Sequence, residues 1–200
     1  VMGTAYYFNG SNAYVEVPHS DVLIPSYELT VVAWINSLDP NRDAKITGKS
    51  PIGSGYVMGQ INGKLYPEIW DSNGARYTFQ AGYIPKGSWT MLAVTWKTGG
   101  NYNGYVNANL VYSGTASQNG IKYTTNPFRV GIAPWSISYH QFYGYISAVY
   151  IYNRALSNTE IQQIYNTPNN PPTNGLVLWF SNPDFTNAVS YTHLRAHETR

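Results

Sequence analysis

The sequence predicts an all-β protein, a two-sheet antiparallel jelly-roll sandwich with one short helix near its C-terminal end. About a dozen short runs of aromatic and β-branched residues follow one another, and turn residues separate them. No helical stretch lies between these runs, whereas a parallel sheet would need crossover helices. The 200 residues are enough for one domain with a substantial hydrophobic core.

Turn residues separate the expected strands. Gly10-Ser11-Asn12 lies between the first two strands, and Asn62-Gly63 is a strong hairpin signal between two later ones. Both alternate sets of residues in 88–97 are largely apolar, as in a central strand of a two-sheet core. In chain order, the expected strands are residues 5–9, 14–17, 28–36, 45–49, 55–61, 64–70, 76–80, 88–97, 104–107, 109–114, 127–132 and 142–153.

One helix is expected directly after the last long strand. Ser157 and Glu160 have capping-box spacing, in which each side chain accepts a hydrogen bond from the other residue's backbone N–H. The helix would end before Thr167-Pro168, because the residue before a proline disfavours helical geometry. Its apolar face would consist of Ile161, Ile164 and Tyr165.

Composition divides the chain into a domain, a linker and a following segment. Residues 1–166 contain the expected strands and the helix. Residues 167–174 are rich in proline and asparagine and are interpreted as a linker. Residues 175–188 have two alternative roles. They begin a following module, which we favour because such linkers usually separate domains, or they fold back as a strand of this domain.

Residues 189–200, VSYTHLRAHETR, differ in composition from the rest of the chain. They hold two of the four His, two of the twelve Lys and Arg, and one of the ten Asp and Glu. The stretch has neither helical nor strand periodicity, and it looks like the translation of a transposase-type sequencing adapter. We interpret it as a non-native adapter tail and exclude it from the fold. A natural disordered tail is the alternative.

The composition argues against several classes of partner. Charged residues are 11% of the chain and the net charge is +2, with no basic run, so nucleic-acid binding is not expected. The absence of cysteine excludes disulfides and thiolate metal sites. The chain has no run of about 18 apolar residues, so membrane insertion is not expected. The first residues, Val1-Met2-Gly3, do not resemble a signal peptide. Either no signal peptide existed or the chain is an internal fragment, and we favour the fragment.

Five stretches occur in an order that is typical of one family. They are FNGSNAYVEV (8–17), LTVVAWI (29–35), GSWTMLAVTW (87–96), YVN (105–107) and GYISAVYIYNRALS (144–157). Together they resemble the laminin G-like modules of the concanavalin A-like lectin/glucanase superfamily. The resemblance covers roughly residues 3–166, and it implies a jelly-roll sandwich in which the capped helix marks the end of the module.

The same resemblance has two further implications. Full modules of this family usually begin with a strand upstream of position 1, so residues 1–166 are expected to lack the first strand of the module. Extracellular or cell-surface localisation is also implied by the resemblance.

Catalysis is not expected. The glucanases of the superfamily use paired carboxylates, usually in an ExDxxE-like pattern on one strand, and this chain has no such pattern. Glu68 and Asp71 come closest, but residues three apart on a strand point to opposite faces. His19 and His140 are single residues, and no Ser–His–Asp order stands out.

No cofactor is expected to be required, and a Ca²⁺ ion would be weakly bound. Modules of the family often hold a structural Ca²⁺ with carboxylates and backbone carbonyls, and the corresponding acidic positions are neutral here. Without carboxylates the site loses most of its attraction for the ion. Such a weak site would use the oxygens of Asn9, Gly10, Asn12 and Ser147.

Sugar binding needs flat aromatic faces beside hydrogen-bonding groups, and loops on a rigid sandwich are the expected place for them. Four aromatic residues in or near expected loops are therefore candidates, although each could instead cover the core. They are Trp70, Tyr102, Trp135 and Tyr139. Three other tryptophans lie in dense apolar strands and are expected in the core, namely Trp34, Trp89 and Trp96.

The favoured function is a non-catalytic carbohydrate-binding or adhesion module of a larger extracellular or cell-surface protein, with a polysaccharide or glycan as its partner. The alternative is a structural spacer or a protein–protein interaction module in a repeat array, whose partners would be neighbouring modules of the same chain. A glycoside hydrolase is the third alternative, and it would need a pair of carboxylates in a cleft.

Overall fold

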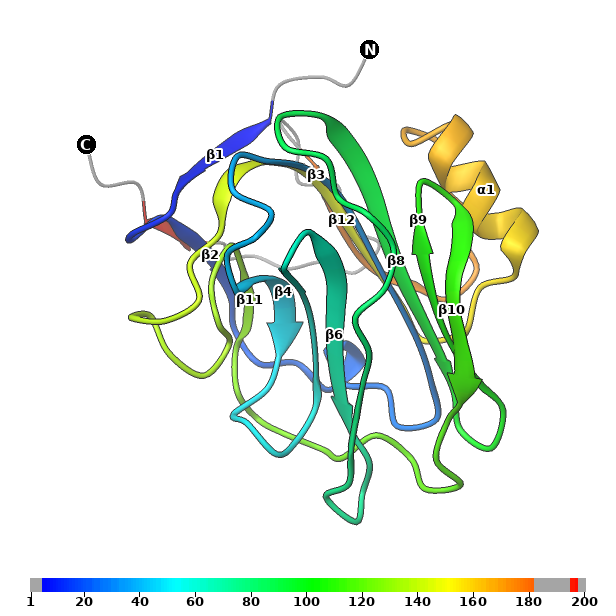
Figure 1. The fold of residues 1–200 in the computed structure, drawn as a ribbon. Helices are drawn as coiled ribbons and strands as arrows, with labels where there is room; N and C mark the ends of the chain where they lie inside the picture. Colours follow the sequence, from blue (N-terminus) through cyan, green and yellow to red (C-terminus); the bar gives the residue numbers. More distant parts are fainter. Residues whose placement is uncertain (1–4, 182–194, 198–200) are drawn as a thin grey trace.

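The computed structural model describes residues 5–181 and 195–197. Two antiparallel sheets, each of seven strands, pack face to face, and one α-helix lies outside them (Figure 1). This confirms the predicted two-sheet sandwich. A short 3₁₀ helix, η1 (Asp21–Leu23), was not expected from the sequence.

The first sheet contains the long central strands of the molecule. Its spatial order is β1-β12-β3-β8-β9-β10, and β13 pairs with β12 as well. Its strands are β1 (Tyr6–Asn9), β3 (Glu28–Ser37), β8 (Trp89–Lys97), β9 (Asn101–Val106), β10 (Asn109–Thr115), β12 (Tyr143–Tyr152) and β13 (Leu176–Ser181).

The second sheet is built mainly from shorter strands, in the order β14-β2-β11-β4-β5-β6-β7. Asn62-Gly63 makes the predicted tight turn between β5 and β6, and both of its residues have a positive φ. The strands are β2 (Tyr14–Val17), β4 (Ala44–Lys49), β5 (Tyr56–Ile61), β6 (Lys64–Trp70), β7 (Arg76–Thr78), β11 (Phe128–Val130) and β14 (Arg195–His197).

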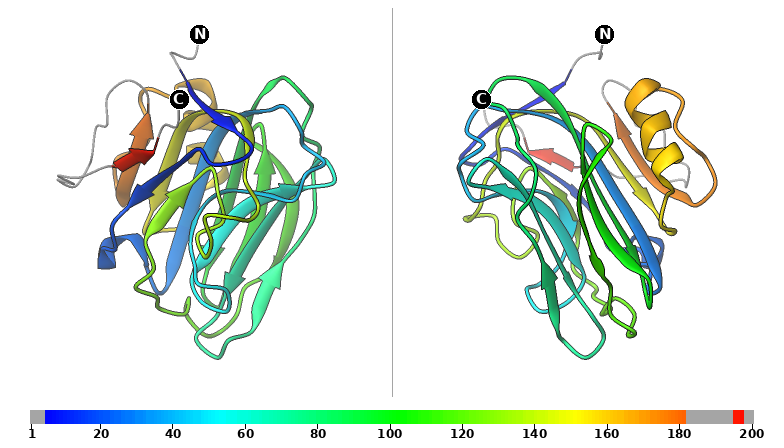
Figure 2. Two further views of the ribbon diagram at one scale, coloured as in Figure 1. Left: turned by 90° about the vertical axis from the view of Figure 1, so that its left-hand side faces the viewer. Right: turned by 45° about the vertical axis from the view of Figure 1, so that its right-hand side comes forward.

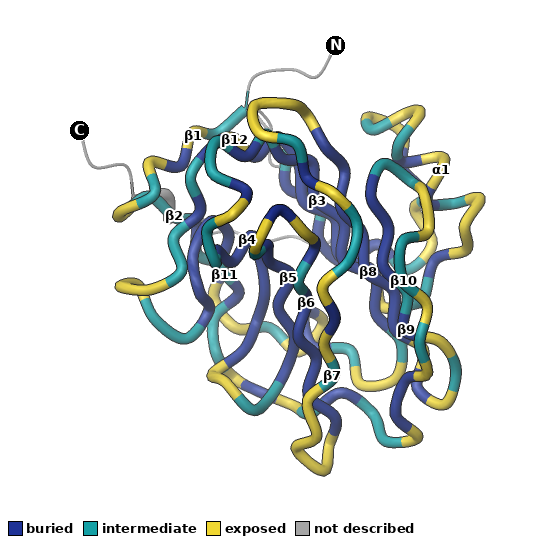
Figure 3. The backbone as a smooth tube through the Cα atoms, viewed as in Figure 1, coloured by how far each residue is buried: buried dark blue, intermediate teal, exposed yellow. Residues whose placement is uncertain are grey.

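The main core lies between the two sheets. Because successive residues of a strand point to opposite faces, each strand contributes every second side chain to this core. Val31, Ala33 and Ile35 of β3 face it from the first sheet, and Leu65 and Ile69 of β6 face it from the second. The buried strand segments therefore form the interior, and the exposed segments are mostly turns and loops (Figure 3).

The helix α1 (Asn158–Asn166) covers the outer face of the first sheet, on the side away from the second sheet (Figure 2). The predicted capping box is present, with Ser157 and Glu160 each accepting from the other's backbone N–H. Ile161 and Ile164 pack in a second buried cluster with Tyr150 and other residues of the sheet's outer face. The helix therefore buries a sheet face that would otherwise expose aromatic side chains to water.

The proline-rich segment after the helix is held against the sheet. Tyr150 Oη donates to the carbonyl of Pro168 at 2.6 Å, and Tyr152 Oη donates to that of Pro172 at 2.7 Å. The segment expected as an interdomain linker therefore connects α1 to β13. Of the two roles considered for residues 175–188, the fold-back strand is the one present at residues 176–181, since β13 pairs with β12. The preference for a following module was wrong for residues 176–181, because pairing with β12 buries their apolar side chains.

The segment interpreted as an adapter tail lies largely outside the described residues. Residues 189–194 and 198–200 are not described, and the backbone of residues 195–197 forms β14 beside β2. The interpretation of residues 189–200 as non-native stays a prediction.

The tryptophans expected in the core are buried in two cases of three. Trp34 and Trp96 are buried, which confirms the prediction for them. Trp89 is 36% exposed, so its assignment to the core was wrong. It is the first residue of β8, where the strand enters the sandwich from an exposed turn. Its side chain therefore stays at the rim.

Gly104 allows the two sheets to approach each other. A Cβ atom at this position of β9 would lie 2.3 Å from Cζ of Phe79 and 3.3 Å from Cδ2 of Leu65.

Replacing Gly104 with alanine should lower the free energy of unfolding by about 1–3 kcal/mol, because the core has no space for the methyl group. Urea denaturation measures this. Gly100→Ala is the matched control, since the atoms nearest to its methyl would be those of the flexible Lys97 side chain, and it should cost less than about 1 kcal/mol. Equal losses in the two variants would contradict this account of Gly104.

Lys49, the last residue of β4, is fully buried without a carboxylate in direct contact among the described residues. Its Nζ donates to the Asn126 carbonyl and lies 2.8 Å from Nδ1 of His19. Burial lowers the pKa of Lys49 to about 8, although the charge of Asp21 opposes this shift. The folded state therefore binds this proton less tightly than the unfolded state does.

The free energy of unfolding should rise from pH 7.5 to pH 9.5, about the range in which the folded protein releases the Lys49 proton and the unfolded chain keeps it. Urea denaturation at both pH values measures the change, and Lys49→Met should remove the rise. The range stops below pH 10 because burial raises the pKa of Tyr150 and Tyr152, which reverses the slope at higher pH. A wild-type stability that is flat or falls over this range would contradict the prediction.

Candidate functional site

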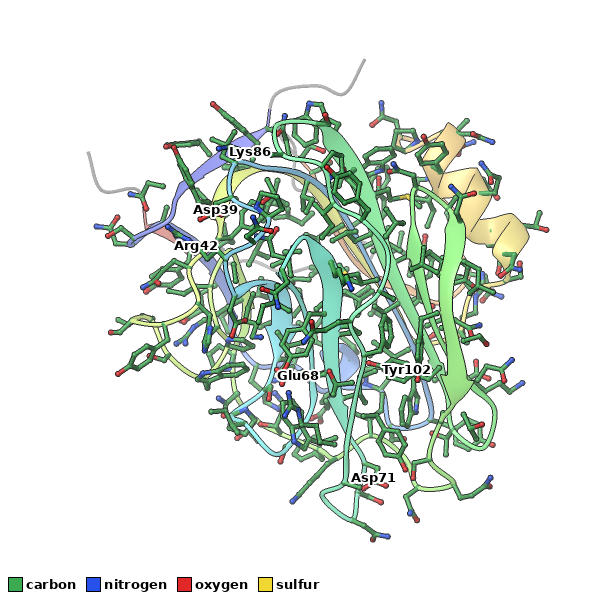
Figure 4. The ribbon with its side chains drawn as sticks, viewed as in Figure 1. Asp39, Arg42, Glu68, Asp71, Lys86 and Tyr102 are labelled. Atoms are coloured by element: carbon green, nitrogen blue, oxygen red, sulfur yellow. The ribbon has the colours of Figure 1, made fainter. Side chains whose placement is uncertain are left out.

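A pocket of about 230 Å³ opens on the outer face of the second sheet, opposite the core. We call it the Trp135 pocket. Its position on β6 is marked by Glu68 in Figure 4. It combines aromatic rings with both signs of charge, and its lining residues are Asp43, Lys45, Ile52, Tyr66, Glu68, Trp70, Arg76, Trp135 and His140.

Strand alternation places most of these side chains. Leu65 and Ile69 of β6 point into the core, so the residues between and after them, Tyr66, Glu68 and Trp70, point outward. On β7, Arg76 pairs in register with Trp70 and reaches the same face. On β4, Ala44 and Ile46 belong to the core and Lys45 lies on the outer face.

The remaining wall comes from the loop between β11 and β12. Gly131 starts this loop with a φ of +85°, and a Cβ atom there would lie 2.1 Å from the ring of Phe8. The backbone N–H of Lys45 donates to the carbonyl of His140 at 2.9 Å, which fastens the loop to β4. Trp135 and His140 are thereby held over the outer face of the sheet, with their rings 5.7 Å apart.

Lys45 is the central charge of the pocket. Its side chain is only 2% exposed, and its Nζ lies 3.0 Å from Oδ1 of Asp43 and 3.6 Å from Oε2 of Glu68. The same ammonium lies 4.5 Å from the ring centre of Tyr66 and 5.9 Å from that of Trp135. A buried charge needs such partners, because its desolvation is otherwise too costly.

The second cation of the pocket is Arg76. Its guanidinium donates to the carboxylate of Glu68 and to Oη of Tyr66. Burial raises the pKa of Tyr66, and so does the charge of Glu68, whereas Arg76 acts in the opposite direction. Tyr66 therefore stays a neutral phenol at physiological pH. His140 Nδ1 lies 3.3 Å from Oδ2 of Asp43, so every carboxylate of the pocket has a nitrogen partner.

This arrangement suits recognition of a hydroxyl-rich ligand. The half-buried ring of Trp135 offers an aromatic face at the opening, and carboxylate oxygens and guanidinium N–H groups lie beside it. The two carboxylates do not face each other freely, because the ammonium of Lys45 lies in contact with both. A bond placed between Asp43 and Glu68 for hydrolysis would have to displace this ammonium.

The structure brings together two of the four residues predicted to bind a ligand. Trp70 and Trp135 both line the pocket, although Trp70 is only 5% exposed. Tyr139 is 64% exposed beside His140 and does not line the pocket. The prediction for Tyr102 was wrong, since β9 starts earlier than expected and buries this ring between the sheets against Phe79 and Trp96.

Sequence reasoning missed the charged residues of the pocket. Asp43 and Lys45 belong to one strand region, Tyr66 and Arg76 to two others, and only folding places them together. Glu68 was considered with Asp71, which is bound elsewhere, to Ser117 and to turn N–H groups. The alternation of polar and apolar residues in KLYPEIW (64–70) was the one available signal.

The residues proposed for a weak calcium site do not fit an ion. Asn9 Oδ1 accepts hydrogen bonds from the backbone N–H groups of Ser11, Asn12 and Ala13, and Asn12 Oδ1 accepts from Asn9 Nδ2 at 2.7 Å. Ser147 is distant, because Asn9 pairs with Tyr143, four residues earlier on β12. These amide oxygens close a turn and do not converge on a cation position.

The Gly10 carbonyl, which was also proposed as a calcium ligand, accepts a hydrogen bond from the guanidinium of Arg42. Arg42 Nη1 donates to the carbonyl of Gly10 at 3.0 Å and to that of Gln141 at 3.3 Å, and the group lies over the ring of Tyr143. Asp39 completes its surroundings with an ion pair at 3.6 Å. Nor do three or more His, Cys, Asp or Glu residues form a metal-binding group in the part of the chain that the structure describes.

Comparison with known proteins gives a family and several structures of the same fold. A family model for the concanavalin A-like lectin/glucanases superfamily matches residues 9–162. No curated protein matches the chain. A proposed carbohydrate-binding protein from Bacteroides ovatus has a TM-score of 0.70 at 18% identity, covering 88% of this chain and 50% of that one. The chain thus spans about half the length of this Bacteroides protein.

Two further structures match over more of their own length. Domain 4 of AbnA, an extracellular arabinanase from Geobacillus stearothermophilus solved with arabinotriose, has a TM-score of 0.62 at 20% identity, covering 82% of this chain and 77% of that one. A heptameric pentraxin from Limulus polyphemus has a TM-score of 0.66 at 13% identity, with coverage of 96% and 91%. At these identities the likeness shows a shared fold.

The Arg42 contacts give a prediction about calcium. The melting temperature of the wild-type protein should differ by less than about 1 °C between millimolar CaCl₂ and EDTA, since an ion that does not bind the folded state cannot stabilise it. Arg42→Ala should lower the free energy of unfolding by about 1–2 kcal/mol, because two carbonyls lose a charged donor. The free energy of unfolding of Arg42→Lys should lie between those of the wild type and Arg42→Ala, since lysine keeps the positive charge but lacks the several N–H donors of the guanidinium. A calcium-dependent rise in the wild-type melting temperature would contradict this account.

Proposed function

Because the chain belongs to the concanavalin A-like lectin/glucanases superfamily, we propose that it is a non-catalytic carbohydrate-binding module whose sugar site is the Trp135 pocket. The observation that supports this most is the combination in one pocket of a half-buried indole with a fixed set of hydrogen-bonding charges. We further propose that the module works outside the cell or at its surface, as part of a larger protein.

The chemistry of sugars fits these side chains. A sugar ring has an apolar face of C–H groups that packs on an aromatic ring, and a rim of hydroxyls that both donate and accept hydrogen bonds. Trp135 would supply the ring. The carboxylates of Asp43 and Glu68 accept from hydroxyls, and the guanidinium of Arg76 donates to them. Because ion pairs already fix these groups, little side-chain entropy would be lost on binding.

Two proteins of similar structure also support carbohydrate binding. One is a proposed carbohydrate-binding protein, and another is a domain of an extracellular arabinanase solved with arabinotriose. Among the described residues, no helix is long and apolar enough to span a bilayer.

A second candidate function, glycoside hydrolysis, is favoured by one observation, namely that Asp43 and Glu68 line the same pocket. Hydrolases use one carboxyl group as an acid and the other as a nucleophile or base, with the scissile bond between them. Here Lys45 contacts both carboxylates and Arg76 pairs with Glu68. The ammonium therefore takes the space that the scissile bond would need, and we place binding above catalysis.

A glycan array tests the proposal directly. The wild-type protein should bind a defined set of glycans, and Trp135→Ala should weaken that binding about tenfold or more, because the aromatic face is lost. Trp89→Ala is the matched control, since Trp89 is 36% exposed on the first sheet and does not line the pocket. Its affinity should equal that of the wild type. Circular dichroism melts confirm that both variants are folded.

Three results would contradict the proposal. If the folded wild-type protein binds no glycan, the spacer or protein-interaction function gains support. If both tryptophan variants lose binding equally, the Trp135 pocket is not the site. If the bound glycan yields new reducing ends, and Glu68→Gln and Asp43→Asn abolish them, the chain is a hydrolase.

A further inference from the structure

A second and larger cavity, of about 440 Å³, lies near the start of β6. We call it the Tyr83 cavity. Three segments form its rim, and backbone hydrogen bonds join them, from Gly63 to Pro40 and from Ile84 to Gly63. Its lining residues are Asp39, Pro40, Asn41, Asn62, Gly63, Lys64, Gly82, Tyr83, Ile84 and Lys86.

The Tyr83 cavity continues the outer surface that holds the Trp135 pocket. Lys64 lines the cavity and belongs to the same alternating set of β6 as Tyr66 and Glu68, which line the pocket. Four strand residues span about 13 Å, so Lys64 and Glu68 lie within the length of a short oligosaccharide. Figure 4 shows Asp39 and Lys86 toward the beginning of β6 and Glu68 further along it.

The same segment of chain forms a wall of both sites. Asp39 and Asn41 line the Tyr83 cavity, and Asp43 and Lys45 line the Trp135 pocket. Between them, Arg42 is fixed by the carbonyls of Gly10 and Gln141. One segment, anchored by Arg42, therefore connects the two sites.

The two sites differ in charge. In the Trp135 pocket each carboxylate has a cationic partner, and the cations Lys45 and Arg76 are both paired. In the Tyr83 cavity the one carboxylate, Asp39, pairs with Arg42. Lys64 and Lys86 are exposed and make no ion pair within residues 5–181. The cavity therefore has an excess of positive charge, which no carboxylate of the described residues neutralises.

An aromatic face accompanies this charge. Tyr83 is 73% exposed, more than any other large hydrophobic residue that the structure describes as exposed. The amides of Asn41 and Asn62 lie on the rim of the same cavity. An exposed ring, two amides and two unpaired ammonium groups together fit a sugar unit that carries an anionic substituent.

We propose that the Tyr83 cavity is a second subsite, which takes an anionic sugar unit of the same polysaccharide that the Trp135 pocket binds. The anionic group is the carboxylate of a uronic acid or a sulfate ester, since both present oxygens to ammonium donors. This inference rests on the proposed function, and it specifies the ligand class as an acidic polysaccharide of at least a few units.

The test compares oligosaccharides of two to six units in neutral, uronate-containing and sulfated forms, with affinities measured for immobilised glycans at low and high salt. Wild-type protein should prefer an anionic form over the neutral form, and the preference should shrink at about 1 M NaCl, where exposed charges are screened. The double variant Lys64→Gln/Lys86→Gln should lose about two- to fivefold of the anionic affinity per lysine and none of the neutral affinity. Whether uronates or sulfates bind better identifies the anionic group.

Two controls separate this inference from the proposed function. Lys122→Gln removes one positive charge from a lysine that lines neither site, and it should leave both affinities unchanged. Tyr83→Ala should weaken the longer oligosaccharides and leave the shortest ones unaffected. If neutral and anionic forms bind equally, and the double variant binds as the wild type does, the subsite is overturned while the sugar site stands. If no oligosaccharide of any form binds the folded protein, the proposed function itself fails.

Discussion

The second sheet depends on one geometric constraint, which is that neighbouring residues of a strand point to opposite faces. Leu65 and Ile69 must face the first sheet to complete the core, and this fixes Tyr66, Glu68 and Trp70 on the outer face. The same register that buries the core therefore builds the Trp135 pocket. A slip of one residue would expose the apolar set and bury the charged set, so the core and the site stabilise the same arrangement.

Charge distribution then separates the two sites on this face. Lys45 is almost fully buried, and it is compatible with the fold because two carboxylates and two aromatic rings surround it. The exposed lysines of the Tyr83 cavity need no such partners, because water solvates them. One site is therefore internally neutral and preorganised, whereas the other keeps a net positive charge for a ligand. Arg42, which donates to the carbonyls of Gly10 and Gln141, holds the segment between them.

The sequence was sufficient for the fold class and insufficient for most of the site. The Asn62-Gly63 turn and the Ser157–Glu160 capping box are local signals and appear at the predicted residues, and most of the expected strands overlap the observed ones. The site brings together Asp43, Tyr66 and Trp135 from three separate segments, and no local sequence pattern predicts that these segments lie side by side. The prediction that Tyr102 binds a ligand was wrong because its glycine- and asparagine-rich surroundings are typical of a loop, whereas the residue lies in strand β9. Tertiary packing also decided the role of residues 176–181, whose linker-like neighbour is held down by Tyr150 and Tyr152.

The most direct test of the central claim is an NMR titration that follows the indole N–H signals of the six tryptophans. The titrant is the oligosaccharide that binds most strongly on the array, and single Trp→Phe variants assign the signals. The account predicts that the Trp135 signal shifts with added sugar while the signal of Trp96, which is fully buried in the core, stays in place. Shifts that leave Trp135 unchanged and move the signal of Trp89, at the rim of the other sheet, would contradict it.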